Sequence, residues 1–177
     1  MEQTKSGLRK VNREQAIELV KESKSNPEAK GIILLGKVGT GKTETIRTSR
    51  MTTARNLYDV YTETDRNKPN GTEGVRQVIN NMIDYERRNV TIDEIGVEDN
   101  AKKFGNTLDP IEWCVMNIYE ANQKTLHTEL DDAKQIRLYM TSNLNINSLE
   151  TRYGDRVIDR LHQMCDIYVL DDTNLRR

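Results

Sequence analysis

The sequence is poor in cysteine, proline and bulky aromatic residues, and it carries no excess of charge of either sign. Its two cysteines, Cys114 and Cys165, belong to no C-x-x-C pair and stand at no spacing typical of metal ligands. This argues against a disulfide framework or a zinc site as the basis of the fold. Two buried free thiols in a reducing compartment are expected instead.

The sequence also lacks a long hydrophobic run. No apolar stretch approaches the length of a membrane span, and the first residues are polar, without the apolar segment of a signal peptide. Lys and Arg number 27 against 28 Asp and Glu, and the two signs are interspersed, so any nucleic-acid binding must use a local patch. We therefore expect a cytoplasmic protein without a membrane partner, and a single domain with a real core.

The most specific pattern runs from Gly36 to Thr43 and matches G-x-x-x-x-G-K-[ST] at every fixed position. Glycines allow backbone N–H groups to wrap a phosphate, and the helix that follows favours an anion at its start. Lys42 would reach the β and γ phosphates of a nucleotide, and Thr43 would bind Mg²⁺. The apolar run 31–35 is typical of a strand buried on both faces, so a strand leads directly into the loop.

A second pattern is the β-rich run Asn89–Glu94, which ends in two acidic residues. Hydrolysis of a nucleotide with Mg²⁺ needs one carboxylate that holds the metal and another that polarises the attacking water. We assign Asp93 to the metal and Glu94 to the water. The predicted strand 135–143 also ends in polar residues, and Asn143 there would reach the γ phosphate or the water.

Helices are predicted between these strands. Asn12 and Gln15 resemble a capping box for a helix that ends near Asn26 and packs beside the nucleotide pocket, after a polar, mobile tail over residues 1–10. Further helices are expected over 54–61, 75–83 and 111–119, with Arg87-Arg88 closing the second, and a last strand over 166–170.

The segment after Thr43 is unusually short. A parallel crossover normally needs a helix of ten or more residues, and only about seven are available before the next plausible strand. Three alternatives stay open: the crossover is short, the helix continues through Tyr58 and a strand is missing, or the chain omits a segment.

Several motifs, in this order, resemble one family. They are Gly36–Thr43, Ile92–Gly96, Thr141–Leu144 and Arg152–Leu161. Together they resemble the ATPase domain of DnaC-type helicase loaders, which belong to the AAA+ class, with the transposition helper IstB nearby. The resemblance covers roughly residues 30 to 177.

The resemblance implies a P-loop NTPase fold of the AAA+ type, with three αβα layers, a five-stranded parallel sheet in the order 5-1-4-3-2 and no C-terminal lid domain. Residues 1–29 would form an N-terminal tail and helix, and residues 30–177 the ATPase domain. The implied ligands are ATP or ADP and Mg²⁺. The implied nucleotide-binding residues are Gly36, Val38, Gly39, Thr40, Gly41, Lys42, Thr43 and Glu44, with Thr43 and Asp93 at the metal and Glu94 and Asn143 at the reacting phosphate.

The family also implies three arginine roles. The stretch Arg152–Leu161 matches its arginine-finger motif, which makes Arg160 the first candidate to touch a neighbouring subunit's γ phosphate and Arg156 the second. Arg176 falls where the family carries its second sensor arginine. These assignments imply self-association through the face that carries the finger.

The leading functional hypothesis is an ATPase that assembles on single-stranded DNA and acts on a replicative DnaB-type helicase. Candidate DNA contacts are Arg55, Arg66, Lys68, Arg76 and Lys102-Lys103, each of which could equally be solvated surface charge. The alternative is an ATP-dependent adaptor of a transposase, whose nucleotide state controls assembly. A small P-loop kinase fits less well, because Thr141–Asn143 and Arg160 are better explained by the AAA+ pattern.

Overall fold

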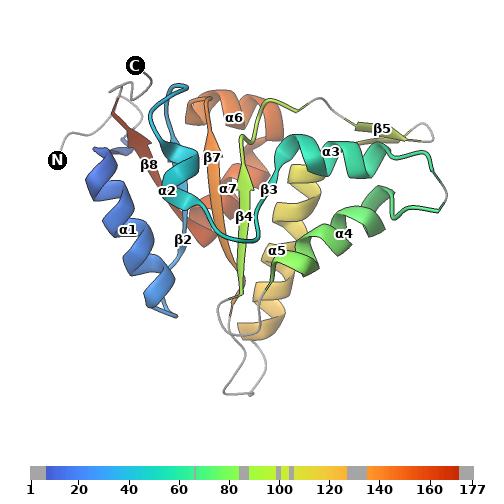
Figure 1. Cartoon of the computed structure of the whole chain (residues 1–177), viewed down its shortest axis with the longest axis horizontal. Coiled ribbons are helices and arrows are strands. Elements are labelled where there is room, and N and C mark those ends of the chain that lie inside the picture. The colour runs from blue at the N-terminus through green and yellow to red at the C-terminus, as the bar shows by residue number, and fades with distance from the viewer. Residues whose placement is uncertain are drawn as a thin grey trace.

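The computed structural model describes residues 7–65, 67–83, 88–98, 101–103, 106–126 and 135–171. Its strands are β1 (Arg9–Val11), β2 (Gly31–Leu35), β3 (Thr52–Thr53), β4 (Asn89–Asp93), β5 (Ala101–Lys103), β6 (Asn106–Leu108), β7 (Arg137–Ser142) and β8 (Cys165–Leu170). Six of them form one open, all-parallel sheet in the order β1-β8-β2-β7-β4-β3 (Figure 1). The short β5 and β6 form a separate antiparallel pair, which the sequence did not predict.

Helices cover both faces of the sheet. They are α1 (Arg13–Ser25), α2 (Lys42–Ile46), α3 (Ala54–Thr62), α4 (Gly71–Met82), α5 (Pro110–Leu126), α6 (Ile146–Tyr153) and α7 (Asp155–Met164). Residues of α1 and α2 share a small core with one face, and residues of α3 to α7 share a larger core with the other. The fold is therefore a three-layer α/β arrangement. No helix in the described part of the chain combines the length and hydrophobicity needed to cross a membrane.

The central strand β2 explains the apolar run in the sequence. Ile33 and Leu35 pack in the larger core, whereas Ile32 and Leu34 pack in the smaller one. Successive side chains of a strand point to opposite faces, so a strand with helices on both sides must be apolar throughout. Its carboxyl end delivers the chain directly into the loop that begins at Gly36.

Strand β4 is apolar on one face only. Val90 and Ile92 pack in the larger core, so by strand alternation Asn89, Thr91 and Asp93 face the side that carries α1 and α2. The β4 surface under α2 is therefore polar, and its last residue is the predicted metal ligand.

The expectation of a five-stranded sheet in the order 5-1-4-3-2 was wrong, because the sheet has six strands and β1 forms its edge. Arg9 and Lys10, expected in a mobile tail, belong to β1, and Arg9 stands in register with Tyr168 of β8. Its guanidinium lies 5.9 Å from the centre of the Tyr168 ring, and Lys10 Nζ lies 3.1 Å from Asp171 Oδ1. Inward of β1, the strands follow one another as β8-β2-β7-β4-β3.

The crossover after the loop is short, which is the first of the three alternatives. Helix α2 ends at Ile46, β3 consists of Thr52–Thr53 alone, and α3 begins at Ala54. The two residues of β3 pair with Ile92 and Asp93 of β4, so the connection needs to reach only the last part of that strand. A short helix followed by a loop is sufficient for this path.

One helix terminus agrees with the sequence prediction and another differs from it. The capping box of Asn12 and Gln15 forms as predicted, and Asp109 caps α5 by accepting from the backbone of Ile111 at 2.8 Å. The prediction that Arg87-Arg88 closes α4 was wrong for Arg88, because α4 ends at Met82 and Arg88 lies beyond it with φ of 48°. Arg87 lies outside the described residues.

Candidate functional site

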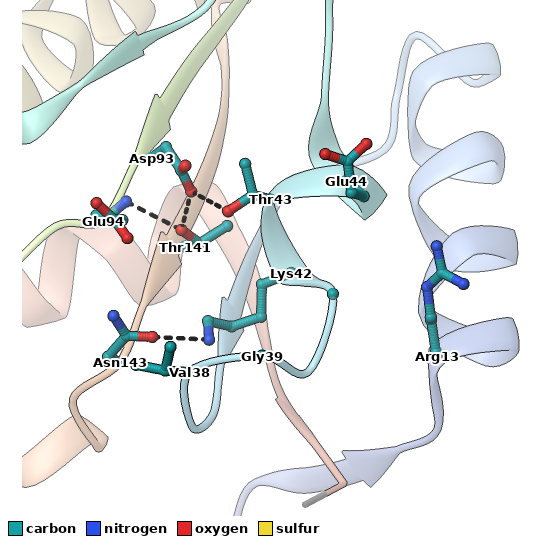
Figure 2. Close-up of a pocket in the computed structure, with 11 residues that line it drawn as sticks. Arg13, Val38, Gly39, Lys42, Thr43, Glu44, Asp93, Glu94, Thr141 and Asn143 are labelled. Atoms are coloured by element: carbon teal, nitrogen blue, oxygen red, sulfur yellow. Dashed lines mark hydrogen bonds between the residues drawn. The ribbon is translucent and has the colours of Figure 1, made fainter. Parts of the chain in front are cut away.

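A pocket of about 750 Å³ lies where the loop after β2 meets the carboxyl ends of β4 and β7 (Figure 2). The predicted residues that line it are Val38, Gly39, Gly41, Lys42, Thr43, Glu44, Asp93, Glu94 and Asn143. Open parallel sheets bind ligands at this edge, outside the carboxyl ends of their strands. The structure thus brings together residues from three distant parts of the sequence.

Glycines, one hydroxyl group and one backbone hydrogen bond shape the loop. Gly39 and Gly41 both adopt φ of 87°, a left-handed conformation that side chains rarely allow. Thr40 Oγ1 donates to the carbonyl of Lys37 at 3.0 Å, and the backbone N–H of Gly36 donates to the Ser142 carbonyl at 3.2 Å. Gly36 and Thr40 do not line the pocket; they hold the loop in shape and tie it to β7.

Lys42 is buried at the base of the loop, with 6 % of its surface exposed. Its Nζ donates to the carbonyls of Gly36 at 2.7 Å and Lys37 at 2.8 Å, and to Asn143 Oδ1 at 2.9 Å. A buried ammonium group must be compensated by hydrogen bonds, and these three acceptors provide that compensation. The predicted phosphate-binding lysine and the predicted sensor are therefore in direct contact.

A chain of hydrogen bonds joins the two predicted acidic residues to their neighbours (Figure 2). Asp93 Oδ1 accepts from Thr43 Oγ1 at 3.0 Å and from Thr141 Oγ1. The same Thr141 hydroxyl accepts from the backbone N–H of Glu94 at 3.0 Å. Sequence reasoning missed Thr141, because a threonine inside a strand is common and only the fold places it between Asp93 and Glu94.

Glu94 turns sharply away from β4. It adopts φ of 58°, which is uncommon for a residue with a side chain, and its side chain is exposed at the pocket. The next residue returns to the sheet, since the Ile95 N–H donates to the Thr141 carbonyl at 2.9 Å. Residues held in such sparsely populated conformations cluster at functional sites, so this turn makes Glu94 a candidate functional residue.

Thr43 and Asp93 are suited to hold a magnesium ion. Both offer oxygen atoms, which Mg²⁺ prefers, and these atoms lie 3.0 Å apart at the pocket. In the described ranges, no group of three His, Cys, Asp or Glu side chains forms a complete metal cage. A magnesium ion here would take its remaining ligands from phosphate and water, as is usual at nucleotide sites.

A buried ionic network lies behind the Glu94 turn. Glu98 is 2 % exposed; its Oε2 accepts from the Gly96 N–H at 2.9 Å, and its Oε1 accepts from the Tyr153 hydroxyl. Arg152 Nη2 lies 3.3 Å from Glu98 Oε1 and 3.2 Å from Asp109 Oδ2. This network fixes the segment after Glu94 to the start of α5 and the end of α6. Arg152, which belongs to the predicted finger motif, therefore bonds within its own chain.

Burial and the nearby Glu98 carboxylate raise the pKa of Asp109 above its ordinary value, although Arg152 and two backbone N–H groups partly oppose this shift. Sequence reasoning did not identify the role of Glu98. Its partners Arg152 and Tyr153 are remote in sequence, so no local pattern could reveal its burial.

The predicted arginines of the finger motif lie away from this pocket. Arg160 packs its guanidinium over the Tyr119 ring of α5, 4.3 Å from the ring centre, and pairs with Asp159 at 3.0 Å. Arg156 on the same helix is exposed and makes no hydrogen bond or ion pair with the residues that the structure describes. Arg176 lies outside the described residues.

Three of the six predicted DNA contacts have described side chains, and all three are paired with acids of the same chain. Arg55 lies 3.1 Å from Asp59, Lys68 lies 3.4 Å from Glu63, and Arg76 lies 3.8 Å from Glu73. Arg66 and the side chains of Lys102-Lys103 fall outside what the structure describes. Exposed pairs of this kind are weak, so they could open for a ligand, but they do not form a basic patch.

Sequence reasoning also missed Arg13. It is the first residue of α1 and lines the pocket on the side opposite Asn143 (Figure 2). In the described part of the chain it makes no hydrogen bond or ion pair. Its position confirms the expectation that the first helix packs beside the pocket.

No protein-family model matches the chain, and no curated protein sequence matches it. The functional argument therefore depends on the geometry of the pocket and on the order of the motifs.

Proposed function

We propose that the protein binds and hydrolyses ATP with Mg²⁺, as a P-loop NTPase of the AAA+ type. One observation carries the proposal: Lys42, Asp93, Glu94 and Asn143, predicted from separate motifs, meet in one pocket around the glycine loop. Hydrolysis requires a cation for the phosphates, a carboxylate for the metal and a second carboxylate for water, and this pocket offers all three.

Each residue has a defined task in the proposed reaction. The loop N–H groups and Lys42 hold the β and γ phosphates, while Thr43 and Asp93 hold the ion. When bound, Mg²⁺ neutralises charge on the phosphate oxygens. Glu94 accepts a proton from the water that attacks the γ phosphorus, and the bond to the ADP oxygen breaks. Asn143 orients the water or the γ phosphate by a hydrogen bond.

A neighbouring subunit would complete the site. The arginines of α7 do not line the chain's own pocket, which fits a role in another copy. An arginine supplied in this way can contribute on the order of 10³ to 10⁵ in rate. The exposure of Arg156 favours it over Arg160, whose guanidinium is already packed on Tyr119.

We further propose that this ATPase acts as a helicase loader, assembling on single-stranded DNA and acting on a replicative helicase. The support is the order of four motifs that resemble the DnaC-type family. Steady-state ATPase assays with and without single-stranded DNA, with a pull-down of replicative helicase in ATP, test this step. If DNA and helicase have no effect while a transposase is captured in ATP, the adaptor hypothesis replaces it.

The ATPase itself is tested with Lys42→Ala and Glu94→Gln. We expect Lys42→Ala to lose ATP binding, because the ammonium that compensates the phosphates is removed. Glu94→Gln should bind ATP like the parent but release phosphate at least about 10²-fold more slowly, since general-base catalysis is lost. Glu73→Gln, the same change on the exposed face of α4, serves as the control. Unchanged ATP affinity in Lys42→Ala would show that the pocket has been misassigned.

A further inference from the structure

We infer that a second pocket, at the amino end of β4, binds the phosphate group of a nucleotide or of a nucleic-acid strand. It measures about 410 Å³, and its polar lining consists of Lys24, Arg47, Thr48, Ser49, Arg50 and Asn89. Three of these residues are cationic and two carry hydroxyl groups, whereas no described lining residue carries a carboxylate. Such a set of donors suits a phosphate.

The pocket exists because the crossover is short. Helix α2 ends at Ile46, and residues 47–50 continue as a loop. A longer helix would cover the face of β4 that carries Asn89 and Thr91. Instead, Thr48 Oγ1 reaches Thr91 Oγ1 at 3.4 Å, and the surface beside it stays open. Strand β3 adds no cover, because it pairs only with Ile92 and Asp93.

This pocket is separate from the proposed ATP site. Asn89 begins β4 and Asp93 ends it. Four steps along a strand at roughly 3.3 Å each place them about 13 Å apart, so one pocket lies at the amino ends of the strands and the other at the carboxyl ends. The two pockets share no lining residue. The inference therefore stands independently of the proposed ATPase activity.

Two groups in this pocket have unused bonding capacity. Asn89 Oδ1 is buried and accepts no hydrogen bond. The Arg50 side chain is exposed and makes no hydrogen bond or ion pair with any residue in the described ranges, whereas its backbone carbonyl accepts from Thr48 Oγ1 at 2.8 Å. A buried acceptor without a donor is unfavourable, so a ligand that supplies one is favoured.

The other cations add to a positive potential here. Lys24 Nζ donates to the Ile46 carbonyl at 3.2 Å and lies 5.2 Å from the centre of the Tyr139 ring. Among the described residues, Arg47 forms an exposed ion pair with Glu44. Arg137, the register partner of Asn89, is buried next to the pocket and donates to carbonyls at the end of α1. A negatively charged ligand would be attracted to this region.

The cationic side chains together with the unsatisfied Asn89 Oδ1 favour the binding of a nucleoside phosphate over that of a simple anion. The phosphate oxygens would accept from the Arg50 guanidinium and the Ser49 hydroxyl, and a sugar hydroxyl or a base N–H would donate to Asn89 Oδ1. Sulfate or a carboxylate supplies acceptors alone and leaves Asn89 unsatisfied. The source of the phosphate can be a strand of DNA or a free nucleotide.

The test measures two probes on the full chain: a fluorescein-labelled oligothymidylate by fluorescence polarisation, and AMP by calorimetry. We expect Arg50→Gln to weaken at least one probe by about tenfold, with a shallower salt dependence, since it removes one phosphate contact. Lys124→Gln, which removes an exposed cation of α5 outside both pockets, should change either affinity by less than about twofold. Asn89→Leu, which keeps the volume but removes the acceptor, should weaken the same probe.

The pattern of loss identifies the source. Loss of the oligonucleotide alone assigns the pocket to a nucleic-acid strand, and loss of AMP alone assigns it to a free nucleotide. Lys42→Ala should leave this binding intact, so a signal lost in Lys42→Ala but kept in Arg50→Gln belongs to the first pocket. If Arg50→Gln, with an unchanged thermal midpoint, binds both probes like the parent, the inference is overturned.

Discussion

The ammonium group of Lys42 lies 2.9 Å from Oδ1 of Asn143, so a hydrogen bond joins the glycine loop to the end of β7. A phosphate that enters the pocket must compete with this acceptor for Lys42. Asn143 would then be released to contact the γ phosphate or the water. The contact therefore couples occupation of the loop to the placement of the predicted sensor.

Replacing Asn143 with Ala should separate binding from hydrolysis. Lys42 keeps its two carbonyl acceptors, so ATP affinity should change by less than about threefold, whereas loss of one stabilising group typically lowers turnover by 10² to 10³. Binding of a fluorescent ATP analogue and single-turnover phosphate release measure the two effects. Asn147→Ala, on the exposed side of α6, is the matched control. Equal turnover in the two variants would remove Asn143 from the reaction.

The two arginines of α7 are distinguished by stability as well as activity. Arg160→Ala removes a cation–π contact with Tyr119 and should lower the free energy of unfolding by about 0.5 to 1 kcal/mol. Arg156→Ala should leave stability unchanged but abolish the rise in specific ATPase activity with protein concentration. Urea denaturation and a concentration series of ATPase rates are the measurements. Concentration-dependent activity that survives in Arg156→Ala and disappears in Arg160→Ala would restore Arg160 as the finger.

The raised pKa of Asp109 should make the free energy of unfolding depend on pH. Its pKa is raised above the ordinary value of 3.8, chiefly by burial and by Glu98. The folded state thus binds this proton more tightly than the unfolded state, and the stabilisation is full below pH 3.8 and is lost as the pH rises through the folded pKa. Asp109→Asn keeps a side-chain cap for α5 but cannot titrate.

We therefore expect the parent to lose stability relative to Asp109→Asn as the pH rises from 3.8 through the raised pKa of folded Asp109. Urea denaturation of both proteins across this range measures the difference. A difference that stays constant with pH would show that Asp109 does not titrate with a raised pKa.

The two cysteines should be inert in the folded protein. Both are buried, as the sequence indicated, and burial raises the pKa of Cys114 to about 12 and also raises that of Cys165. Since the thiolate is the reactive form, Ellman's reagent at about pH 8 should modify neither thiol in native buffer. Both should react in guanidinium chloride. Rapid reaction before unfolding would show that one thiol is accessible.

Much of the fold follows from local sequence, because the residue pattern within β2, β4 and the glycine loop is sufficient to predict the structure of each segment. The apolar run 31–35 predicts a strand covered on both faces, and the loop glycines predict the turn after it. Asp93, Glu94 and Asn143 could be placed because parallel strands present their carboxyl ends at one edge. Their meeting with Lys42 follows from the order β2-β7-β4 in the sheet, which places the ends of β4 and β7 beside the loop after β2.

The unpredicted features depend on contacts between distant segments. Arg9–Val11 has no strand periodicity, and β1 forms because β8 offers an edge with which to pair. Thr141 acts through Asp93 and Glu94, and Glu98 is buried only because Arg152 and Tyr153 reach it from α6. The second pocket likewise follows from the length of α2, whose end at Ile46 could not be fixed from sequence alone.

The pairing of β1 with β8 has a consequence for synthesis on the ribosome. Strand β1 is made long before its partner β8, and β2 also needs β8 as a neighbour. Until Tyr168 leaves the exit tunnel, β1 has no partner in the sheet and β2 is paired on one side only. The nascent chain therefore carries an incomplete sheet throughout the synthesis of the segments between β1 and β8, and the sheet can close only after β8 has emerged.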